Sequence, residues 1–220
     1  MLYKTHQTTS YTVAGLIYYT NYIIYRDVQN TNIIDKCILT VNQFISKYVL
    51  NVNWLFDYQR HSYWQGKFFI FSLLICVAIG ALLPDIDHPN SKLGRHMPQW
   101  FTNNIEHRTF THSLLVYIPL ILALQFIALP SIGTTCINAL LLGACLHILE
   151  DYFSIESIHL FYPFGGNKRT KYSKFRYHTG GLSETIIFYI MLLGAIIVTI
   201  MWLADPKTII LVAKNYTKIL

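Results

Sequence analysis

Eight side chains that can bind a metal ion stand at four separate places in a sequence that is otherwise poor in charge. They are His6; Asp85, Asp87 and His88 in PDIDHP; His107 and His112 in EHRTFTHSLL; and His147 and Asp151 in HILED. Imidazole and carboxylate ligands without thiolates suit zinc, manganese or iron better than calcium or magnesium. Because eight ligands exceed what one tetrahedral ion needs, we expect two or more divalent ions.

The spacing of His147 and Asp151 predicts the most definite local geometry. Residues four apart on a helix lie on one face, so this pair can hold one ion together. A hydrogen-bonded pair at a helix end would have the same spacing. The two prolines of PDIDHP predict a short irregular segment in which its carboxylates and imidazole converge, and a polar turn that caps the next element is the alternative. His107 and His112, taken singly, are also compatible with structural roles.

The chemistry predicted for such a cluster is hydrolysis, because bound ions lower the pKa of a water and stabilise a phosphoryl group in transit. Asp85, Asp87 and Glu150 are the catalytic candidates, with Glu150 as a general base or, alternatively, a surface carboxylate. The basic stretch NKRTKYSKFR could bind phosphate, although a solvated loop or an anchor beside anionic lipid explains it as well. The candidate phosphate-binding residues are Arg108, Lys168, Arg169, Lys171, Lys174 and Arg176.

The elements that must position these residues are apolar. Hydrophobic residues make up 53% of the chain and charged residues 13%, against about 25% charged in a typical soluble domain. Four segments are predicted to be membrane helices: 68–83, 113–132, 136–149 and 185–204, with a weaker fifth at 11–25. We therefore expect an all-α bundle of about four or five transmembrane or membrane-embedded helices.

The alternation of these segments places all the candidate ligands on one side of the membrane. A chain changes sides at each crossing, so His6, PDIDHP, the two histidines of EHRTFTHSLL and the HILED pair arrive at the same face. Ionisable groups at membrane depth are functional candidates. The sequence therefore predicts a metal site at one membrane face. Lysine and arginine are almost equally divided between the two sides, and only the density of the stretch from Lys168 to Arg176 favours the cytoplasmic one.

The whole chain, residues 1–220, is interpreted as one membrane-embedded domain, because no linker divides it. Residues 31–64 form an insert in which apolar residues recur every three or four positions. This pattern predicts an amphipathic helix that lies on the membrane or on the bundle. The sequence pI is about 9.1, but the basic residues alternate with membrane segments and no nucleic-acid motif is present, so no nucleic-acid partner is expected.

The segments LLPDIDHPNSKLG, HRTFTHSLL, HILEDYFS with the following FYPF, and the N-terminal KTH resemble the YdjM-like family of bacterial membrane-bound metal-dependent hydrolases. The resemblance covers most of the chain in the correct order, and it places all eight ligands on motif positions. It implies a multi-pass protein of the bacterial inner membrane. The family is distantly similar to zinc-dependent phospholipases C and single-strand nucleases, which makes Zn²⁺ the expected ion. The segment TGGLSE resembles the closing motif of the family and adds Glu184 as a secondary catalytic candidate.

The expected function is that of a membrane-bound hydrolase that cleaves a phosphoester in a phospholipid or lipid-linked substrate with a metal-activated water. Membrane lipids are the expected partners, because a site at the mouth of a helix bundle meets lipid headgroups directly. The alternative from another class is a non-enzymatic membrane protein whose metal site is structural, regulatory or used in transport.

Overall fold

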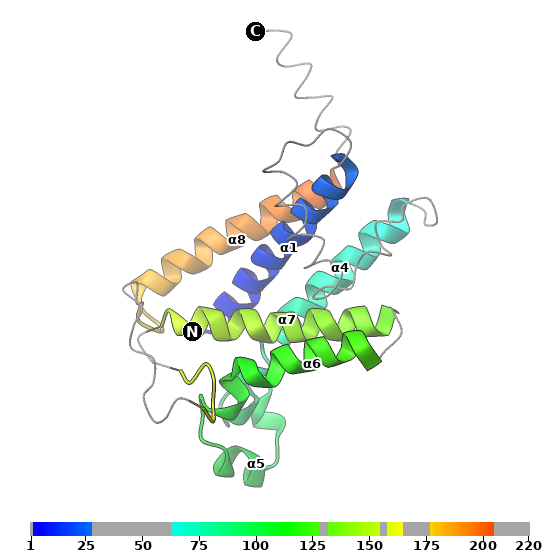
Figure 1. Ribbon diagram of the computed structural model, residues 1–220. Helices are drawn as coiled ribbons and strands as arrows, with labels where there is room; N and C mark the ends of the chain where they lie inside the picture. Colours follow the sequence, from blue (N-terminus) through cyan, green and yellow to red (C-terminus); the bar gives the residue numbers. More distant parts are fainter. Residues whose placement is uncertain (1, 28–62, 128–131, 155–157, 165–176, 205–220) are drawn as a thin grey trace.

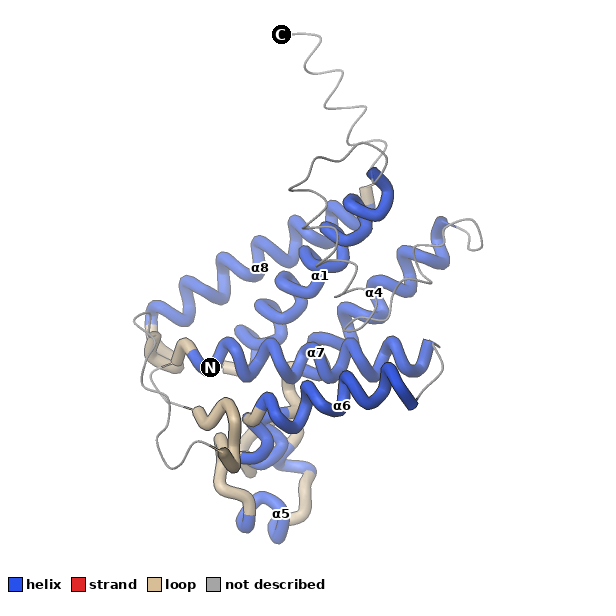
Figure 2. Tube along the Cα trace, viewed as in Figure 1, coloured by secondary structure: helices blue, strands red, loops and turns tan. Residues whose placement is uncertain are grey.

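The computed structural model of the 220-residue chain describes residues 2–27, 63–127, 132–154, 158–164 and 177–204. Within these ranges the regular structure is helical, without a β-strand, and the predicted all-α class is confirmed (Figure 2). The longer helices are α1 (Tyr3–Asp27), α4 (Tyr63–Gly80), α6 (Leu114–Ile127), α7 (Ile132–Tyr152) and α8 (Leu182–Leu203). Short helices between α4 and α6 are η3 (Pro84–Asp87), η4 (Gly94–His96), α5 (Gln99–Asn104) and η5 (Phe110–His112).

The long helices pack in pairs around two apolar clusters. Helix α8 runs along α1, α1 also packs on α4, and α7 packs between α4 and α6 (Figure 1). The first cluster, with Tyr18, Leu73 and Trp202, joins α1, α4 and α8, and the second, with Ile148 and Ile158, lies beside α6 and α7. The start of α1 and the end of α7 meet at one end of the bundle, close to the short helices (Figure 1). This end contains the candidate ligands.

Three helical segments of the described chain are long and apolar enough to cross a membrane: Ile70–Asp87, Gly133–Tyr152 and Leu182–Leu203. They agree with three of the four stronger predictions. The fourth, at 113–132, contains the shorter apolar stretch Leu114–Leu124 in α6. Only 11% of the Leu182–Leu203 segment is buried inside the protein, so most of its apolar surface is available to lipid. The length and composition of these helices thus support the predicted membrane location.

Helix α1 contains the weaker predicted segment, 11–25, but is not one of these three apolar segments, and its sequence includes several hydroxyl side chains. Ser10 and Thr12 are buried against neighbouring helices. The Thr12 hydroxyl lies within hydrogen-bonding distance of the backbone carbonyls of Thr8, at 2.8 Å, and of Met191 in α8, at 2.9 Å. Such bonds satisfy polar groups among apolar helices, so α1 is held by its neighbours through polar contacts as well as packing.

Helices α4 and α7 approach each other closely at two glycines. A Cβ atom on Gly80 would lie 1.9 Å from the carbonyl oxygen of Leu140, and one on Gly143 would lie 2.1 Å from that of Val77. Small residues permit this kind of backbone approach between membrane helices. As a result, the chain that leaves α4 lies directly beside the last turns of α7.

A groove of about 470 Å³ lies between α1, α4 and α8. Its lining is mostly apolar and consists of Gln7, Thr8, Tyr11, Ala78, Ala195, Ile196, Thr199 and Ile200. The predicted insert, 31–64, lies outside the described residues except for Tyr63 and Trp64, which begin α4.

Candidate metal centre

Six of the eight predicted ligands form two adjacent groups of metal-binding atoms. His6 from α1 meets His147 and Asp151 from α7, and Asp85 from η3 meets His107 and His112 near η5. The ligand atoms within each group lie within 4.8 Å of one another. Four segments that are far apart in the sequence thus converge, as predicted, although the side of the membrane that they face stays a prediction.

Two carboxylates join the groups into one centre. The Asp151 carboxylate lies 3.4 Å from His6 Nε2 and 3.6 Å from the Nε2 atoms of both His112 and His147. Asp85 Oδ1 lies 3.5 Å from His112 Nε2 and 3.7 Å from His147 Nε2. Two ligands of one tetrahedral zinc, each about 2.0–2.1 Å from it, are about 3.3 Å apart. The observed separations are therefore close to those of atoms that share an ion.

The Nε2 atoms of His6, His112 and His147 provide an independent test of whether the residues fit a metal. All three rings are at most 1% exposed, and these atoms have no hydrogen-bond partner among the described residues. A buried polar atom without a partner costs about 1–3 kcal/mol. Three such nitrogens directed at two carboxylates suit a divalent cation, so the residues present fit the predicted group.

The opposite nitrogen of each ring is fixed by a hydrogen bond. His147 Nδ1 donates to the Ala81 carbonyl oxygen at 2.6 Å, and His6 Nδ1 donates to Glu150 Oε2 at 2.7 Å. His107 Nδ1 donates to Asp87 Oδ1 at 2.8 Å. Such bonds hold the proton on Nδ1 and leave Nε2 as the ligand atom, which is the usual arrangement of metal-binding histidines.

Asp87 supports the centre and is placed behind its ligands. Its side chain is fully buried, and its second oxygen accepts a hydrogen bond from Thr111 Oγ1 at 2.5 Å. Because that hydroxyl gives its proton to Asp87, its oxygen can accept from His112 Nδ1, 3.2 Å away. Asp87 therefore orients His107 directly and His112 through Thr111, a role different from the ligand predicted.

Glu150 also lies behind a ligand. Only 10% of its side chain is exposed, and it accepts hydrogen bonds from His6 Nδ1 and from the Ser10 hydroxyl at 3.1 Å. The structure thus places it neither on the surface nor in the open part of the centre. Its position is that of a carboxylate that orients His6 and raises the basicity of the ring.

His88 and Glu184 lie outside the two groups of ligands. His88 Nδ1 accepts the backbone N–H of Asn90 at 3.2 Å, and its ring lies 4.8 Å from the His107 ring, centroid to centroid. Glu184 is 1% exposed and accepts the backbone N–H groups of Leu2 and Gly180. It ties the start of the chain to the turn before α8, and this contact places the turn of α1 that contains His6.

Comparison with known proteins identifies the family. The sequence model described as YdjM inner membrane protein matches residues 57–214, a segment that contains every candidate ligand except His6. The chain belongs to the YdjM family. The YdjM inner membrane protein of Escherichia coli (strain K12) is 38% identical over 89 residues, which are 37% of this chain and 44% of that protein.

A second relative of this YdjM-family chain is the uncharacterized protein YvsG of Bacillus subtilis (strain 168). It is 39% identical over 90 residues, which are 39% of this chain and 54% of that protein. The chain thus spans about half the length of the curated relatives it matches. No solved structure matches it.

Proton binding differs between the histidines of this YdjM-family centre. Burial lowers the pKa of His6, but the neighbouring carboxylates of Asp151 and Glu150 outweigh burial and raise that pKa to about 9. Burial lowers the pKa of His112. At neutral pH His112 is therefore ready to bind a metal, whereas a metal must displace a proton from His6, and binding should release it.

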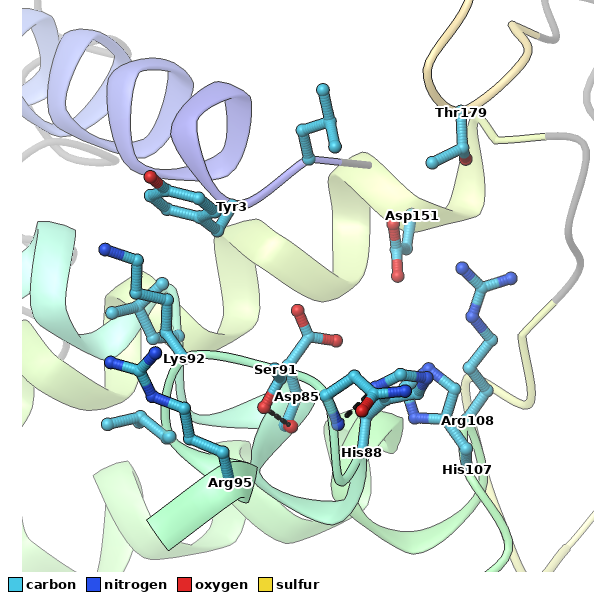
Figure 3. Close-up of a pocket in the computed structure, with 14 residues that line it drawn as sticks. Tyr3, Asp85, His88, Ser91, Lys92, Arg95, His107, Arg108, Asp151 and Thr179 are labelled. Atoms are coloured by element: carbon cyan, nitrogen blue, oxygen red, sulfur yellow. Dashed lines mark hydrogen bonds between the residues drawn. The ribbon is translucent and has the colours of Figure 1, made fainter.

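The centre opens into a cavity of about 500 Å³ (Figure 3). Asp85, His107 and Asp151 line it, and Arg108, which was predicted to bind phosphate, lines it as well. The other predicted phosphate-binding residues, Lys168, Arg169, Lys171, Lys174 and Arg176, lie outside the described residues. Sequence reasoning missed Lys92 and Arg95 in the cavity wall, although both follow PDIDHP by only a few residues.

The contact between Glu150 and His6 leads to a prediction about metal affinity. Glu150→Ala should weaken zinc binding by about 10- to 100-fold, the usual effect of removing a carboxylate that orients a ligand histidine. Competition with a chromophoric chelator measures the change. Glu106→Ala is the matched control, because Glu106 is an exposed carboxylate outside both ligand groups. Equal affinity in the Glu150 and Glu106 variants would show that Glu150 does not support the centre.

Proposed function

We propose that this YdjM-family membrane protein is a metal-dependent hydrolase that cleaves a phosphoester in a phospholipid or lipid-linked substrate. The observation that carries the proposal is that the ligand cluster is open on one side. Asp85, His107 and Asp151 line the cavity, and Asp85 exposes 24% of its side chain. Structural zinc sites are closed by protein ligands, whereas catalytic sites keep a position for water or substrate.

The residues that would hold divalent ions are His6, Asp85, His107, His112, His147 and Asp151. Zn²⁺ is the favoured ion, and the nitrogen and oxygen ligands also suit Mn²⁺ or Fe²⁺. When bound, the metal supplies Lewis-acid chemistry, which lowers the pKa of a water and withdraws charge from phosphoryl oxygens.

The protein's own groups prepare the site for that chemistry. The Nδ1 hydrogen bonds of His6, His107 and His147 keep three Nε2 atoms directed inward. Cationic side chains in the cavity wall, such as Arg108, would neutralise the charge of a phosphate beside the carboxylates. Of the two carboxylates in the centre, Asp85 is the more exposed, at 24% against 2% for Asp151. It therefore lies nearer to an entering substrate than Asp151 does.

A lipid substrate is supported by the position of the groove between α1, α4 and α8. Tyr3 and Leu82 line the polar cavity. Gln7, one helical turn after Tyr3, and Ala78, four residues before Leu82, line the groove. The cavity and the groove therefore lie one after the other along the same two segments, the start of α1 and the chain around the end of α4. A substrate with a phosphate head in the cavity could place its hydrocarbon chain in the groove, where apolar burial stabilises it.

The test uses purified protein in lipid vesicles, with and without its metal. Stripping the metal with a chelator should abolish release of phosphate or of the phosphorylated headgroup, and added Zn²⁺ should restore it. Mass spectrometry of the lipid products is the measurement, and parallel additions of Mn²⁺ and Fe²⁺ identify the active ion. Stoichiometric metal without turnover of phosphatidate, phosphodiester lipids or polyprenyl phosphates would contradict the hydrolase and favour a structural, regulatory or transport site.

A further inference from the structure

Three cationic side chains line the cavity from two sides. Lys92 and Arg95 lie together on one wall, Arg108 lies across from them, and Asp85 and Asp151 lie between (Figure 3). Cationic side chains lie on both walls, and the metal ligands lie between them. An anion in the cavity would therefore be contacted from several directions. This arrangement extends beyond the metal centre itself.

The loop that contains Lys92 is attached directly to the metal centre. The Ser91 hydroxyl donates to the Asp85 carbonyl oxygen at 2.6 Å and accepts from the Gly94 N–H at 2.8 Å. A Cβ atom on Gly94 would lie 2.0 Å from the His88 carbonyl oxygen, so the loop can close this tightly only with glycine there. The positions of Lys92 and Arg95 are thereby fixed relative to Asp85.

Lys92 and Arg95 are exposed to solvent in the cavity wall, where side-chain contacts restrain them. The Lys92 ammonium lies 4.4 Å from the centroid of the Tyr3 ring, a cation–π contact, and Arg95 Nε donates to His96 Nε2 at 3.1 Å. In the part of the chain that the structure describes, no carboxylate lies within ion-pair distance of Lys92 or Arg95. Arg108 has a φ of 67°, a left-handed conformation that is uncommon for a side chain other than glycine and often marks a functional position.

We propose that Lys92, Arg95 and Arg108 bind the terminal phosphate of a phosphomonoester, so that the substrate is a lipid with a terminal phosphate. This inference rests on the proposed function and specifies its substrate class. A phosphomonoester has three non-bridging oxygens and one ester arm. Those oxygens can face Lys92 and Arg95, Arg108, and the metal centre at once while the single arm leaves the cavity. A phosphodiester has two such oxygens, less charge, and a second arm that must also pass between the walls.

The reaction for such a substrate is balanced by water alone. A P–O bond forms to the water oxygen, and the P–O bond to the lipid alcohol breaks. One water proton passes to the departing alkoxide oxygen, and the products are the lipid alcohol and inorganic phosphate. Arginine suits this task because its planar guanidinium binds two phosphate oxygens together.

The experiment measures binding and turnover separately. Inorganic phosphate is titrated calorimetrically into the zinc-loaded protein, and turnover of phosphatidate is compared with that of a phosphodiester lipid. Lys92→Ala and Arg95→Ala should each weaken phosphate binding by about two- to fivefold, the usual contribution of a solvent-exposed ion pair, and the double variant should lose more than either. Both variants should raise KM for phosphatidate and leave zinc content unchanged. Arg95→Lys should give an intermediate loss.

Lys4→Ala is the matched control, because Lys4 is an exposed cation on α1 outside the cavity lining. The inference would be overturned if the Lys92→Ala/Arg95→Ala double variant bound phosphate as tightly as the Lys4→Ala variant. Faster turnover of the phosphodiester lipid than of phosphatidate would overturn it as well. Phosphate binding that depends on Lys92 and Arg95, without turnover of any lipid, would support the phosphate site and contradict the proposed hydrolase function. Metal-dependent turnover that is unchanged in the Lys92→Ala and Arg95→Ala variants would support the hydrolase function and contradict the phosphate site.

Discussion

Asp151→Asn is expected to remove both bound metal and lipid hydrolysis while the helix bundle stays folded. The Asp151 carboxylate lies 3.4–3.6 Å from the Nε2 atoms of His6, His112 and His147. Asparagine keeps the shape of the side chain but loses its negative charge, and its NH₂ group is a donor that cannot bind a cation. Because one carboxylate serves three imidazoles, its loss should affect the whole centre.

Elemental analysis of the purified Asp151→Asn variant gives its zinc content, which should fall from stoichiometric to background. Phosphate release should become undetectable, and the thermal melt in detergent should match that of metal-stripped wild type. Glu106→Gln, which removes a negative charge from an exposed position, should keep both zinc and turnover. A variant that retains stoichiometric zinc would show that Asp151 is not a ligand, whereas one that unfolds even with zinc present would favour the structural alternative.

The convergence of the ligands could be predicted from the sequence because it depends on rules that hold locally. The four-residue spacing of His147 and Asp151 fixes both on one helix face, and the apolar segments bring distant clusters to one end of the bundle. The different roles of Asp85 and Asp87 within PDIDHP could not be predicted. This segment forms a 3-10 helix, Pro84–Asp87, in which residues two apart point in different directions. Asp85 therefore faces the centre, while Asp87 turns toward His107 and Thr111.

The roles of Glu150 and of the cavity cations depend on tertiary contacts. Glu150 is adjacent to Asp151 in sequence, but its orienting role depends on His6, 144 residues away. Lys92 and Arg95 are exposed in the structure too, and their position beside the centre depends on the Ser91 hydrogen bonds and on the contact of Lys92 with Tyr3. The segment 11–25 of helix α1 was predicted as a weaker membrane segment because it holds Thr and Asn among its aromatic residues, and the structure shows that Thr12 is buried against α8. In each case the local pattern identified a polar residue, and the contacts that it makes in the fold defined its role.

Gly143→Ala is expected to destabilise the protein and weaken its metal centre together. Inside a helix this change is normally stabilising by about 1 kcal/mol, because alanine loses less backbone entropy than glycine. Here the added Cβ would lie 2.1 Å from the Val77 carbonyl oxygen, so α4 and α7 must separate. Overpacking of this kind typically costs about 1–3 kcal/mol. Separation would also draw the Ala81 carbonyl away from His147 Nδ1, 2.6 Å apart in the native structure.

Thermal melts in detergent and zinc titrations of Gly143→Ala measure the two effects. Gly181→Ala is the control at the start of α8, away from the α4–α7 contact, because its added Cβ would lie 3.1 Å from the His178 carbonyl oxygen, a contact that a shift of a few tenths of an ångström relieves. A Gly143→Ala protein as stable as wild type would show that the two helices do not approach this closely. Lost stability with unchanged zinc affinity would show that the packing does not position His147. Loss of both would mean that the glycine contact between two membrane helices sets the geometry of the metal ligands.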